Sequence, residues 1–347
     1  MSDPRDISFG TFNLYNLQLP DTSWRHNANP YSQPEYDAKI GWTSDMLRKL
    51  DCDVIAFQEL WSEQCLVDAF DAAGLSGRYD LAYISDPGQG WYDIAVAAAV
   101  RDPWEIRKKR IHKAFPPGYR LLKRGGAVRD PEDDEIEVSI DKFSRSVIEL
   151  EIGHKDRPDL STIRVLCAHL KSKLTTRLDK EEREQDAVAA NAQALGAAIS
   201  TIRRTAEAAA LRVIITDIIK SSDTPLVVLG DLNDGHLSNT LSILTAQPSY
   251  RPHFKSRTGG RSDAGLYAAS RLEEYRSMRD VNYTHEFNAV KEILDHALVS
   301  EQFYDHSRNR LWSFKEMVIW KDHIEDGDKA TGDHGVVAAR FLYDPAD

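Results

Sequence analysis

The sequence has 347 residues, 41% of them hydrophobic and 29% charged, and its formal net charge is −11. These values are typical of a soluble globular chain with one large α/β domain or two small ones. The net acidity argues against a protein that coats nucleic acid through bulk charge, and no run approaches the ~20 apolar residues of a membrane span.

Short apolar runs alternate with helical patterns along the whole chain. The apolar runs predict strands at residues 6–14, 53–60, 92–100, 145–152, 162–170, 225–232, 292–300 and 335–342. Helices are predicted at 35–50, at 64–74, over an Ala-rich stretch from 179 to about 220 with a break near Gly196, and at 239–245. The polar, glycine-bearing stretch 254–279 predicts loops. This mixture favours one domain with a layered α/β or α+β sandwich.

The cysteines and the first residues bear on the compartment. Cys52, Cys65 and Cys167 are few and show no spacing pattern, so they predict buried thiols in a reducing compartment. The start MSDPRDISFG lacks the basic region and apolar segment of a secretory signal. We therefore expect a cytoplasmic location and no association with a membrane.

The charge is unevenly distributed along the chain. Between Arg101 and Arg129, ten Lys or Arg residues stand against two acidic ones, Asp102 and Glu105. A solvated loop or edge hairpin explains this segment, and so does a flank that faces phosphate groups; both interpretations stay open. The following DPEDDEIE reverses the sign, which indicates a solvent-exposed excursion.

Polar side chains recur at the ends of the apolar runs. They are Asn13, Gln58, Glu59, His169, Asp231, Asn233, Asp295, His296, Asp333 and His334. Placing such groups at the edge of buried runs costs desolvation free energy unless each finds a partner. Convergence on one cluster would supply those partners, and ligands usually bind at strand ends in open sheets.

The chemistry of this set suits a hard divalent cation and a phosphate. Carboxylate oxygens such as those of Glu59 are ligands that Mg²⁺ prefers, whereas no Cys cluster or HExxH motif indicates zinc. His169 and His334 have side chains that donate hydrogen bonds to phosphate or move protons near neutral pH. Asp295 would orient a histidine, and Arg145 would bind the phosphate with its planar guanidinium.

Each of these residues also has a purely structural explanation. Asn13 alone would be a turn or strand-cap amide, His169 a satisfied buried histidine, and GDLND a turn. The residues interpreted as surface or packing residues are His296, His306, Asp322 and His323. The functional interpretation depends on the order and context of the whole set.

Seven short motifs occur between positions 6 and 342: FNLYNL, VIAFQEL, SRSVIEL, CAHLKSK, VVLGDLND, EILDHALVS and GDHGVVAARF. As a set they resemble the endonuclease/exonuclease/phosphatase superfamily, the metal-dependent fold of deoxyribonuclease I-like nucleases, abasic-site endonucleases, inositol-phosphate phosphatases and neutral sphingomyelinases. The resemblance implies one domain over residues 1–347, with its core at about 6–343. It also implies a four-layer α/β (α+β) sandwich, in which helices flank two packed, mostly antiparallel β-sheets.

The resemblance also implies a role for each polar position. Glu59 would be the main Mg²⁺ ligand, with Asn13 beside it and Asp333 supporting the metal or its waters; Mn²⁺ would be a substitute. Asp231 would position or deprotonate the attacking water, and Asn233 would hold the scissile phosphate.

Two histidines and an arginine complete the implied set. His334 would contact a non-bridging oxygen and be oriented by Asp295, while His169 would contact the phosphate or protonate the leaving group. Arg145 resembles the family's arginine near the active site. Tyr15 stands where many members carry an acid or amide, which leaves open whether one or two metal ions act.

The fold class leaves the substrate open. The first hypothesis is a Mg²⁺-dependent nuclease acting on DNA or RNA, with Lys171, Lys173 and Tyr283 in contact with the nucleic acid. The alternative is a phosphatase or phosphodiesterase for a small phosphorylated metabolite or a lipid headgroup, which the net acidity mildly favours. A third hypothesis is a non-catalytic binding module, against which the filled polar positions argue. The sequence leaves the oligomeric state open.

Overall fold

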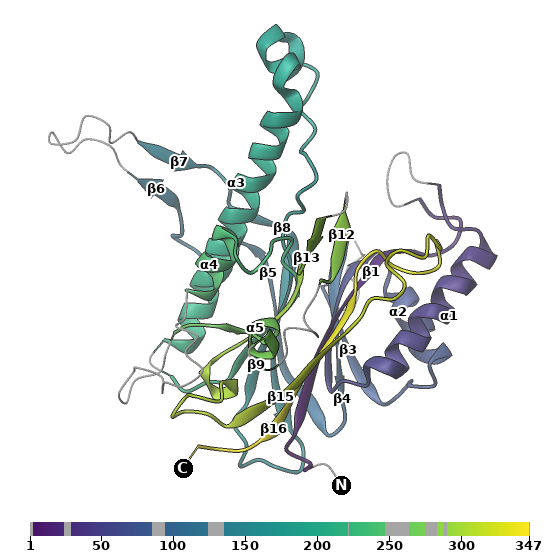
Figure 1. Cartoon of the computed structure of the whole chain (residues 1–347), viewed down its shortest axis with the longest axis vertical. Helices are drawn as coiled ribbons and strands as arrows, with labels where there is room; N and C mark the ends of the chain where they lie inside the picture. Colours follow the sequence, from purple (N-terminus) through teal and green to yellow (C-terminus); the bar gives the residue numbers. More distant parts are fainter. Residues whose placement is uncertain are drawn as a thin grey trace, which may run out of the picture.

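The computed structural model describes residues 3–23, 29–84, 94–123, 135–220, 222–246, 264–274, 276, 283–287 and 290–346. Two six-stranded sheets form the body of the molecule (Figure 1). The first has the strand order β15 (Trp312–Trp320), β16 (Val336–Tyr343), β1 (Ile7–Leu17), β2 (Val54–Leu60), β4 (Ala95–Arg101), β3 (Tyr79–Tyr83). The second has the order β11 (Tyr267–Ala268), β14 (Asp295–Val299), β10 (Leu226–Asp231), β9 (Ile163–His169), β8 (Lys142–His154), β5 (Trp104–Ala114). Outside them lie two hairpins, β6 (Leu121–Lys123) with β7 (Ile136–Val138), and β12 (His285–Phe287) with β13 (Val290–Glu292).

Helices cover the outer face of each sheet. α1 (Gln33–Leu50) and α2 (Glu63–Ala72) lie against the first sheet, and α3 (Asp186–Ile219) and α4 (Asn239–Thr245) against the second (Figure 1). The other helical elements of the described residues are short: α5 (Ala269–Glu274) and the 3₁₀ turns Glu182–Glu184 and Glu301–Phe303. The layers follow the order helices, sheet, sheet, helices, which is the predicted four-layer sandwich.

Three apolar layers hold the sandwich together. In the middle layer, between the two sheets, Phe9 and Phe341 of the first sheet and Val165 and Val227 of the second are all buried. The outer layers lie beneath α1 and α2 on one side and beneath α3 and α4 on the other. The central strands are therefore covered on both faces, which explains their continuous apolar runs in the sequence.

Local signals set the start and the end of α1. The backbone N–H of Ser32 donates to the Glu35 carboxylate at 2.9 Å, one half of a capping box. Pro34 stands in the first turn, where its missing N–H costs no helical hydrogen bond. Asp51 ends the helix in the left-handed region at φ 39°. The same helix buries Lys39 completely, with 0% of the residue exposed.

The Ala-rich stretch forms one helix. α3 runs unbroken from Asp186 to Ile219, so the prediction of a break near Gly196 is wrong. A Cβ at Gly196 would lie 2.2 Å from the carbonyl oxygen of Thr176, whose N–H donates to the Gly196 carbonyl at 3.1 Å. The glycine therefore permits the close approach of a neighbouring segment. The N-terminal part of α3 extends beyond the rest of the molecule (Figure 1).

The predicted strands correspond to β1, β2, β4, β8, β9, β10, β14 and β16, with bounds shifted by a few residues. Residues 92 and 93 of the predicted strand 92–100 lie outside the described residues. Sequence analysis missed β3, β5 and β15 and the short strands β6, β7, β12 and β13. The stretch predicted as loops contains β11 and α5. The four of these strands that belong to the large sheets, β3, β5, β11 and β15, are edge strands. Charged and polar side chains interrupt the apolar pattern of β5 and β15, whereas β11 is only two residues long.

The basic segment after Arg101 forms edge strand β5 and leads into the β6–β7 hairpin. Arg101 pairs with Asp53 at 2.7 Å and Arg110 with Glu149 at 3.7 Å, so part of the positive charge is balanced within the protein. The described part of the segment therefore contains an edge strand paired with β8 and one strand of a hairpin. That it also faces phosphate groups stays a prediction. Its last arginines, 124 and 129, lie outside the described residues.

The structure also bears on the predictions for the cysteines and for membrane-spanning helices. Cys52, Cys65 and Cys167 are free and buried, as predicted. No helix in the described ranges is both long enough and apolar enough to cross a membrane. The assignment of residues 1–347 to one domain stays a prediction.

Two parallel strand pairs bring strand ends together. β1 pairs in parallel with β2 and β9 with β10, so Asn13 lies beside Gln58 and Asp231 beside His169. Gly230 precedes Asp231 with φ 145°, and a Cβ there would lie 1.8 Å from the carbonyl oxygen of Ala168. β10 therefore enters this edge through a position that only glycine fits.

Gly230→Ala will destabilise the protein by about 2–3 kcal/mol, because the added methyl must displace the β9 backbone and the φ angle disfavours L residues. Urea unfolding followed by tryptophan fluorescence measures the change. Gly41→Ala in α1 is the control: its Cβ meets nothing within 4 Å. Helix propensity predicts that this control gains about 0.5–1 kcal/mol. Equal unfolding midpoints for the two variants would contradict the prediction.

Candidate active site

Polar side chains from both sheets meet at the end of the sandwich where β1, β2, β9 and β10 terminate. The buried Asp231 carboxylate is at the centre, and Asn13 Nδ2 donates to its Oδ2 at 3.2 Å. Nε2 of His169 lies 3.5 Å from the same oxygen, and Nε2 of His334 lies 3.9 Å from it. Residues that are distant in the sequence therefore share one carboxylate.

Irregular strand pairing places Glu59. The pairing of β1 with β2 shifts after Asn13, and that of β2 with β4 shifts after Phe57. Glu59 stands in this irregularity with φ 60°, a left-handed conformation that few non-glycine residues adopt. Its Oε2 accepts a hydrogen bond from the N–H of Asn16 at 3.1 Å. Bulged, strained backbone of this kind is typical of functional sites.

The turn after β10 is held by its own polar groups. The N–H of Asn233, which has φ 55°, donates to Asp231 Oδ1 at 2.9 Å. Asn233 Nδ2 and Arg145 Nη1 each donate to the carbonyl oxygen of Leu170, both at 3.1 Å. Asn233 and Arg145 are therefore joined through one backbone carbonyl.

A carboxylate orients the imidazole of His334. Nδ1 of His334 lies 2.8 Å from Asp295 Oδ2, which leaves Nε2 directed toward Asp231. The N–H of the fully buried Asp295 donates to Thr284 Oγ1 at 3.1 Å, and the Thr284 carbonyl accepts from Gly335 at 2.6 Å. Asp295 lies where the sequence expected it, whereas Thr284 carried no sequence signal.

Burial and neighbouring charges shift the pKa values of the cluster in opposite directions. Burial raises the pKa of Asp231 above its ordinary value; His334 opposes this and the Asp295 carboxylate adds to it. Burial alone would lower the pKa of His334, but the carboxylates of Asp295 and Asp231 outweigh burial and raise it well above its ordinary value. Burial lowers the pKa of His169 well below its usual range, and Arg145 lowers it further. These opposite directions favour proton binding by His334 and disfavour it at His169.

A buried lysine lies near Glu59. Lys39 Nζ donates to the carbonyl oxygen of Thr331 at 3.4 Å and lies 5.2 Å from the ring centroid of Tyr15. Burial lowers the pKa of Lys39 to about 8, partly offset by the negative charges of Asp333 and Glu59. Buried ammonium groups without a carboxylate in contact are rare. Sequence analysis missed this residue, although a lysine on the apolar stripe of a helix was a visible signal.

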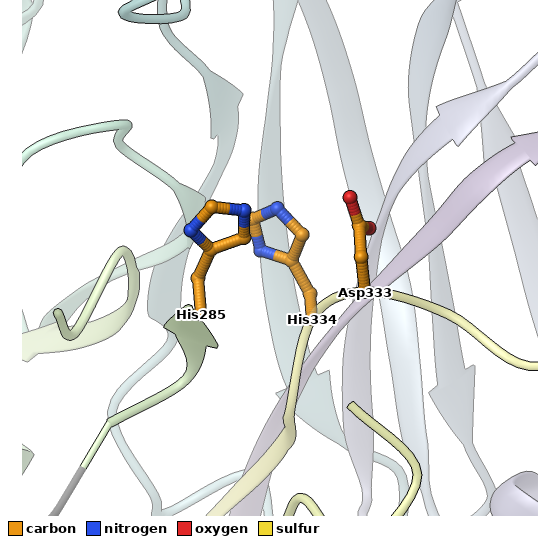
Figure 2. Close-up of side chains that lie close together, drawn as sticks. All are labelled: His285, Asp333 and His334. Atoms are coloured by element: carbon orange, nitrogen blue, oxygen red, sulfur yellow. The ribbon is translucent and has the colours of Figure 1, made fainter. Parts of the chain in front are cut away.

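Two groups of side chains could hold a metal ion. Ligand atoms of Asp231, Asp295 and His334 lie within 4.8 Å of one another, as do those of His285, Asp333 and His334. In the second group the rings of His285 and His334 are 4.7 Å apart, and Asp333 stands beside His334 (Figure 2). Asp333 Oδ1 is buried and has no hydrogen-bond partner among the described residues. This orphaned carboxylate oxygen fits a hard divalent cation, whereas His285 and His334 beside it offer nitrogen atoms.

The three predicted substrate-binding residues have partners of their own. Lys173 Nζ pairs with Glu292 at 2.7 Å, and Lys171 Nζ donates to backbone carbonyl groups at 3.1 and 3.4 Å. Two lysine ammonium groups lie 4.4 and 4.9 Å from the ring centroid of Tyr283. Contact of these residues with nucleic acid stays a prediction.

Two buried charged residues of α3 support the site. Glu207, with 0% exposed, accepts hydrogen bonds from the N–H groups of Ser144 at 2.7 Å and Lys171 at 2.8 Å. Arg204 Nε lies 3.3 Å from the carboxylate of Asp234, which follows Asn233 in the chain. The helix thus ties β8 to the turns after β9 and β10. Sequence analysis missed this role, although two charges at helical spacing inside an Ala-rich stretch could have indicated it.

The histidines interpreted as packing residues have backbone partners. His296 is 1% exposed, and its Nε2 lies 2.9 Å from the carbonyl oxygen of Asp234. His323 is 9% exposed, and its Nε2 lies 2.8 Å from the carbonyl oxygen of His334. Both positions fit the interpretation.

A comparison with family models decides the assignment. The model described as the Endonuclease/Exonuclease/phosphatase family matches residues 10–334. The chain belongs to this family. The resemblance seen in the seven motifs is therefore confirmed, and the family's members are phosphoric ester hydrolases. No curated protein matches the chain.

Solved structures of family proteins share the fold over nearly the whole chain. The endonuclease/exonuclease/phosphatase from Bacteroides vulgatus is 13% identical with a TM-score of 0.55, and the match covers 98% of this chain and 99% of that one. The human Nocturnin catalytic domain with bound sulfate is 13% identical with a TM-score of 0.55, and the match covers 99% of this chain and 97% of that one. TDP2 from C. elegans is 14% identical with a TM-score of 0.53, and the match covers 97% of this chain and 75% of that one. At these identities the similarity shows the fold alone.

Asp295→Asn will lower kcat by about 100-fold or more, because the imidazole of His334 loses the carboxylate that orients and charges it. The lost negative charge also lowers the pKa of both Asp231 and His334, so both limbs of the pH–rate profile move to lower pH. Steady-state kinetics across pH measure both effects, with the exposed Asp217→Asn as control. Unshifted limbs in Asp295→Asn would contradict the prediction.

Lys39→Met will strengthen Mg²⁺ binding by about tenfold, because it removes a positive charge near Glu59 and Asp333 from a site of low dielectric constant. Isothermal titration calorimetry with Mg²⁺, repeated with Mn²⁺, measures the affinity. Lys49→Met, an exposed position in the same helix, serves as control and leaves the affinity unchanged. Weaker binding by Lys39→Met would show that the ammonium group supports the metal site instead.

Proposed function

We propose that this family member hydrolyses phosphodiester bonds in DNA or RNA with Mg²⁺ as cofactor. The observation that supports it best is the buried Asp231 carboxylate, which has Asn13, His169 and His334 at 3.2, 3.5 and 3.9 Å. Phosphoryl transfer requires a positioned water and fixed donors for the charge on the phosphate oxygens. A base, an amide and two imidazoles around one point meet that requirement.

Asp231, His334 and Asn233, at the centre of the site, take different roles. Asp231 accepts the proton of the attacking water, since its raised pKa makes it a stronger base than an exposed carboxylate. His334 donates from Nε2 to a non-bridging phosphate oxygen, because its Nδ1 is held by Asp295. Asn233 holds the phosphate through the amide N–H that Leu170 does not use.

The remaining side chains bind the phosphate and the metal. Neutral His169 suits a hydrogen-bond contact with the phosphate better than proton donation to the leaving oxygen, given its lowered pKa. Arg145, whose charge acts on His169, would bind the same phosphate with its guanidinium. Glu59, Asn13 and Asp333 would hold the Mg²⁺ ion. When bound, the ion supplies Lewis acidity and neutralises phosphate charge, and Mn²⁺ is its expected substitute.

The position of the basic segment favours nucleic acid over a small substrate. β5 ends beside the start of β8, which carries Arg145, and the β6–β7 hairpin continues outward from there (Figure 1). Lys113, Arg120 and Lys123 are exposed along this path. Local positive charge next to a hydrolytic site attracts a polyanion in spite of the net acidity of the chain. The buried free cysteines favour a reducing compartment, and we place the protein in the cytoplasm.

Incubation with plasmid, linear DNA, single-stranded DNA and RNA tests the proposal. We expect cleavage of at least one nucleic acid in Mg²⁺ or Mn²⁺ and none in EDTA. Glu59→Gln and Asp231→Asn will each lower kcat by about 1,000-fold, because they remove a metal ligand and the base. The exposed Glu181→Gln will retain full activity.

A parallel panel separates the alternatives. Turnover of inositol phosphates, nucleotides or lipid headgroup esters without cleavage of any nucleic acid would replace the nuclease with a small-molecule phosphatase. Absence of turnover with every substrate and metal would leave a binding module. Full activity in Glu59→Gln would refute the assignment of the site residues.

A further inference from the structure

The first half of α3, residues 187–202, carries no charged side chain on any of its faces. Most of it belongs to the part of the helix that extends beyond the rest of the molecule (Figure 1). A helical segment of this composition is normally buried, whereas a surface helix presents charged residues on its outer face. An uncharged helix that projects from the body of the molecule therefore calls for a partner.

One face of this half-helix is an apolar stripe. Its residues recur at alternating spacings of four and three: Val188, Ala192, Leu195, Ile199 and Ile202. This alternation is the spacing of a coiled-coil seam. Leu195 and Ile199 are each 40% exposed, and Ile202 is 50% exposed. Three large aliphatic side chains are thus exposed at the spacing that packs one helix against another.

The chain that precedes α3 covers a neighbouring face of the helix. The N–H of Thr176 donates to the carbonyl oxygen of Gly196 and to Oγ of Ser200, both at 3.1 Å. Oγ of Ser200 in turn donates to the carbonyl oxygen of Leu174 at 2.7 Å. At 100° per residue, the apolar stripe lies about a quarter turn away from Gly196 and Ser200. The contact therefore holds the helix in place and leaves the stripe uncovered.

The composition around the stripe argues for an uncharged helical partner. Nucleic acid and anionic membranes bind lysine and arginine side chains, and residues 187–202 contain neither. A second α3 helix offers the same apolar spacing and the same lack of charge. Two copies of the stripe therefore meet without desolvating any charged side chain between them.

We propose that α3 pairs in an antiparallel manner with α3 of a second copy of this chain, through the apolar stripe. A two-fold axis between positions 193 and 194 places Ala192 of each copy opposite Leu195 of the other. The same axis places Val188 opposite Ile199 of the other copy. Each layer then combines a smaller side chain with a larger one, which fills the space between the helices.

Charge favours the antiparallel arrangement over a parallel one. A parallel pair would align the two helix dipoles and set Asp186 beside Asp186 and Arg203 beside Arg203. The antiparallel pair brings Asp186 of each copy to within about one turn of the level of Arg203 in the other. The inference does not depend on the proposed function.

The length of the stripe predicts a weak dimer. From Val188 to Ile202 the helix is about 21 Å long. A helix pair of this length buries less than the ~1,200 Å² of a typical stable interface, so we expect a dissociation constant on the order of 10 µM.

Sedimentation velocity at protein concentrations from about 1 to about 200 µM tests the pairing. The wild type will shift from monomer to dimer over this range. Leu195→Glu/Ile199→Glu will remain monomeric, because pairing would bury its added charges. Ala190→Glu/Gln193→Glu adds the same charge at exposed positions of α3 away from the stripe and will dimerise as the wild type does. Circular dichroism confirms that both variants are folded.

Single cysteine variants test the antiparallel orientation. A short bismaleimide will link Leu195→Cys to its partner copy. It will not link Val188→Cys, because the two copies of that position lie roughly 16 Å apart along the helix axis. The native cysteines are buried, so the wild type serves as the unlinked control. Linking of both variants would show a parallel pair and overturn the proposed arrangement.

Three further outcomes would also overturn the proposal. One is a wild type that stays monomeric at every concentration. Another is equal dimerisation of the wild type and Leu195→Glu/Ile199→Glu, which would place the interface elsewhere. The third is binding of the monomeric wild type to phosphatidylcholine/phosphatidylserine vesicles that Leu195→Glu/Ile199→Glu abolishes, which would assign the stripe to a membrane surface.

Discussion

Two buried carboxylates face each other in this structure. Asp231 on β10 pairs directly with Asp295 on β14, and both are at most 1% exposed. Like charges at opposite positions of a sheet destabilise it, and burial increases the cost. The imidazole of His334 resolves the conflict, with Nδ1 on Asp295 and Nε2 toward Asp231. A proton on the imidazole between Asp295 and Asp231 therefore makes the pair of carboxylates tolerable, and the proposed contact of His334 with phosphate would depend on the same proton.

Around Asp231 and Asp295, polar groups form hydrogen bonds with residues that lie outside the cluster itself. Thr284 supports Asp295, and Glu207 of α3 binds the N–H groups of Ser144 and Lys171. A buried network is stabilising when its members are paired, because an unpaired polar group in a low dielectric costs more than a pair gains. The long helix is thus part of the positioning of the site and does more than cover the sheet.

The sequence was sufficient for the central strands and the four layers, because buried runs are local signals. It also indicated the polar residues at strand ends that lie together around Asp231, whose roles stay predictions. It was insufficient where the cause is tertiary. Edge strands such as β5 lack an apolar pattern because one side meets solvent or charge. Gly196 was interpreted as a helix break because the sequence does not show that the backbone of Thr176 packs against it. Lys39 and Glu207 stand out in the sequence as charged residues on apolar or Ala-rich helical stretches, but their partners come from distant segments, as the neighbours of His285 do.

The site takes its groups from both sheets: Asn13 and Glu59 come from the first, and His169, Asp231 and Asp295 from the second. Neither sheet alone contains a complete arrangement. The apolar layer between them, with Phe9 and Val227 on opposite sides, therefore sets the spacing between Asn13 and Glu59 on one sheet and Asp231 on the other, the proposed metal ligands and the proposed base. A chain in which each sheet has formed but the two have not docked would possess every strand and no complete site, so hydrolysis would report the packing of the two sheets against each other.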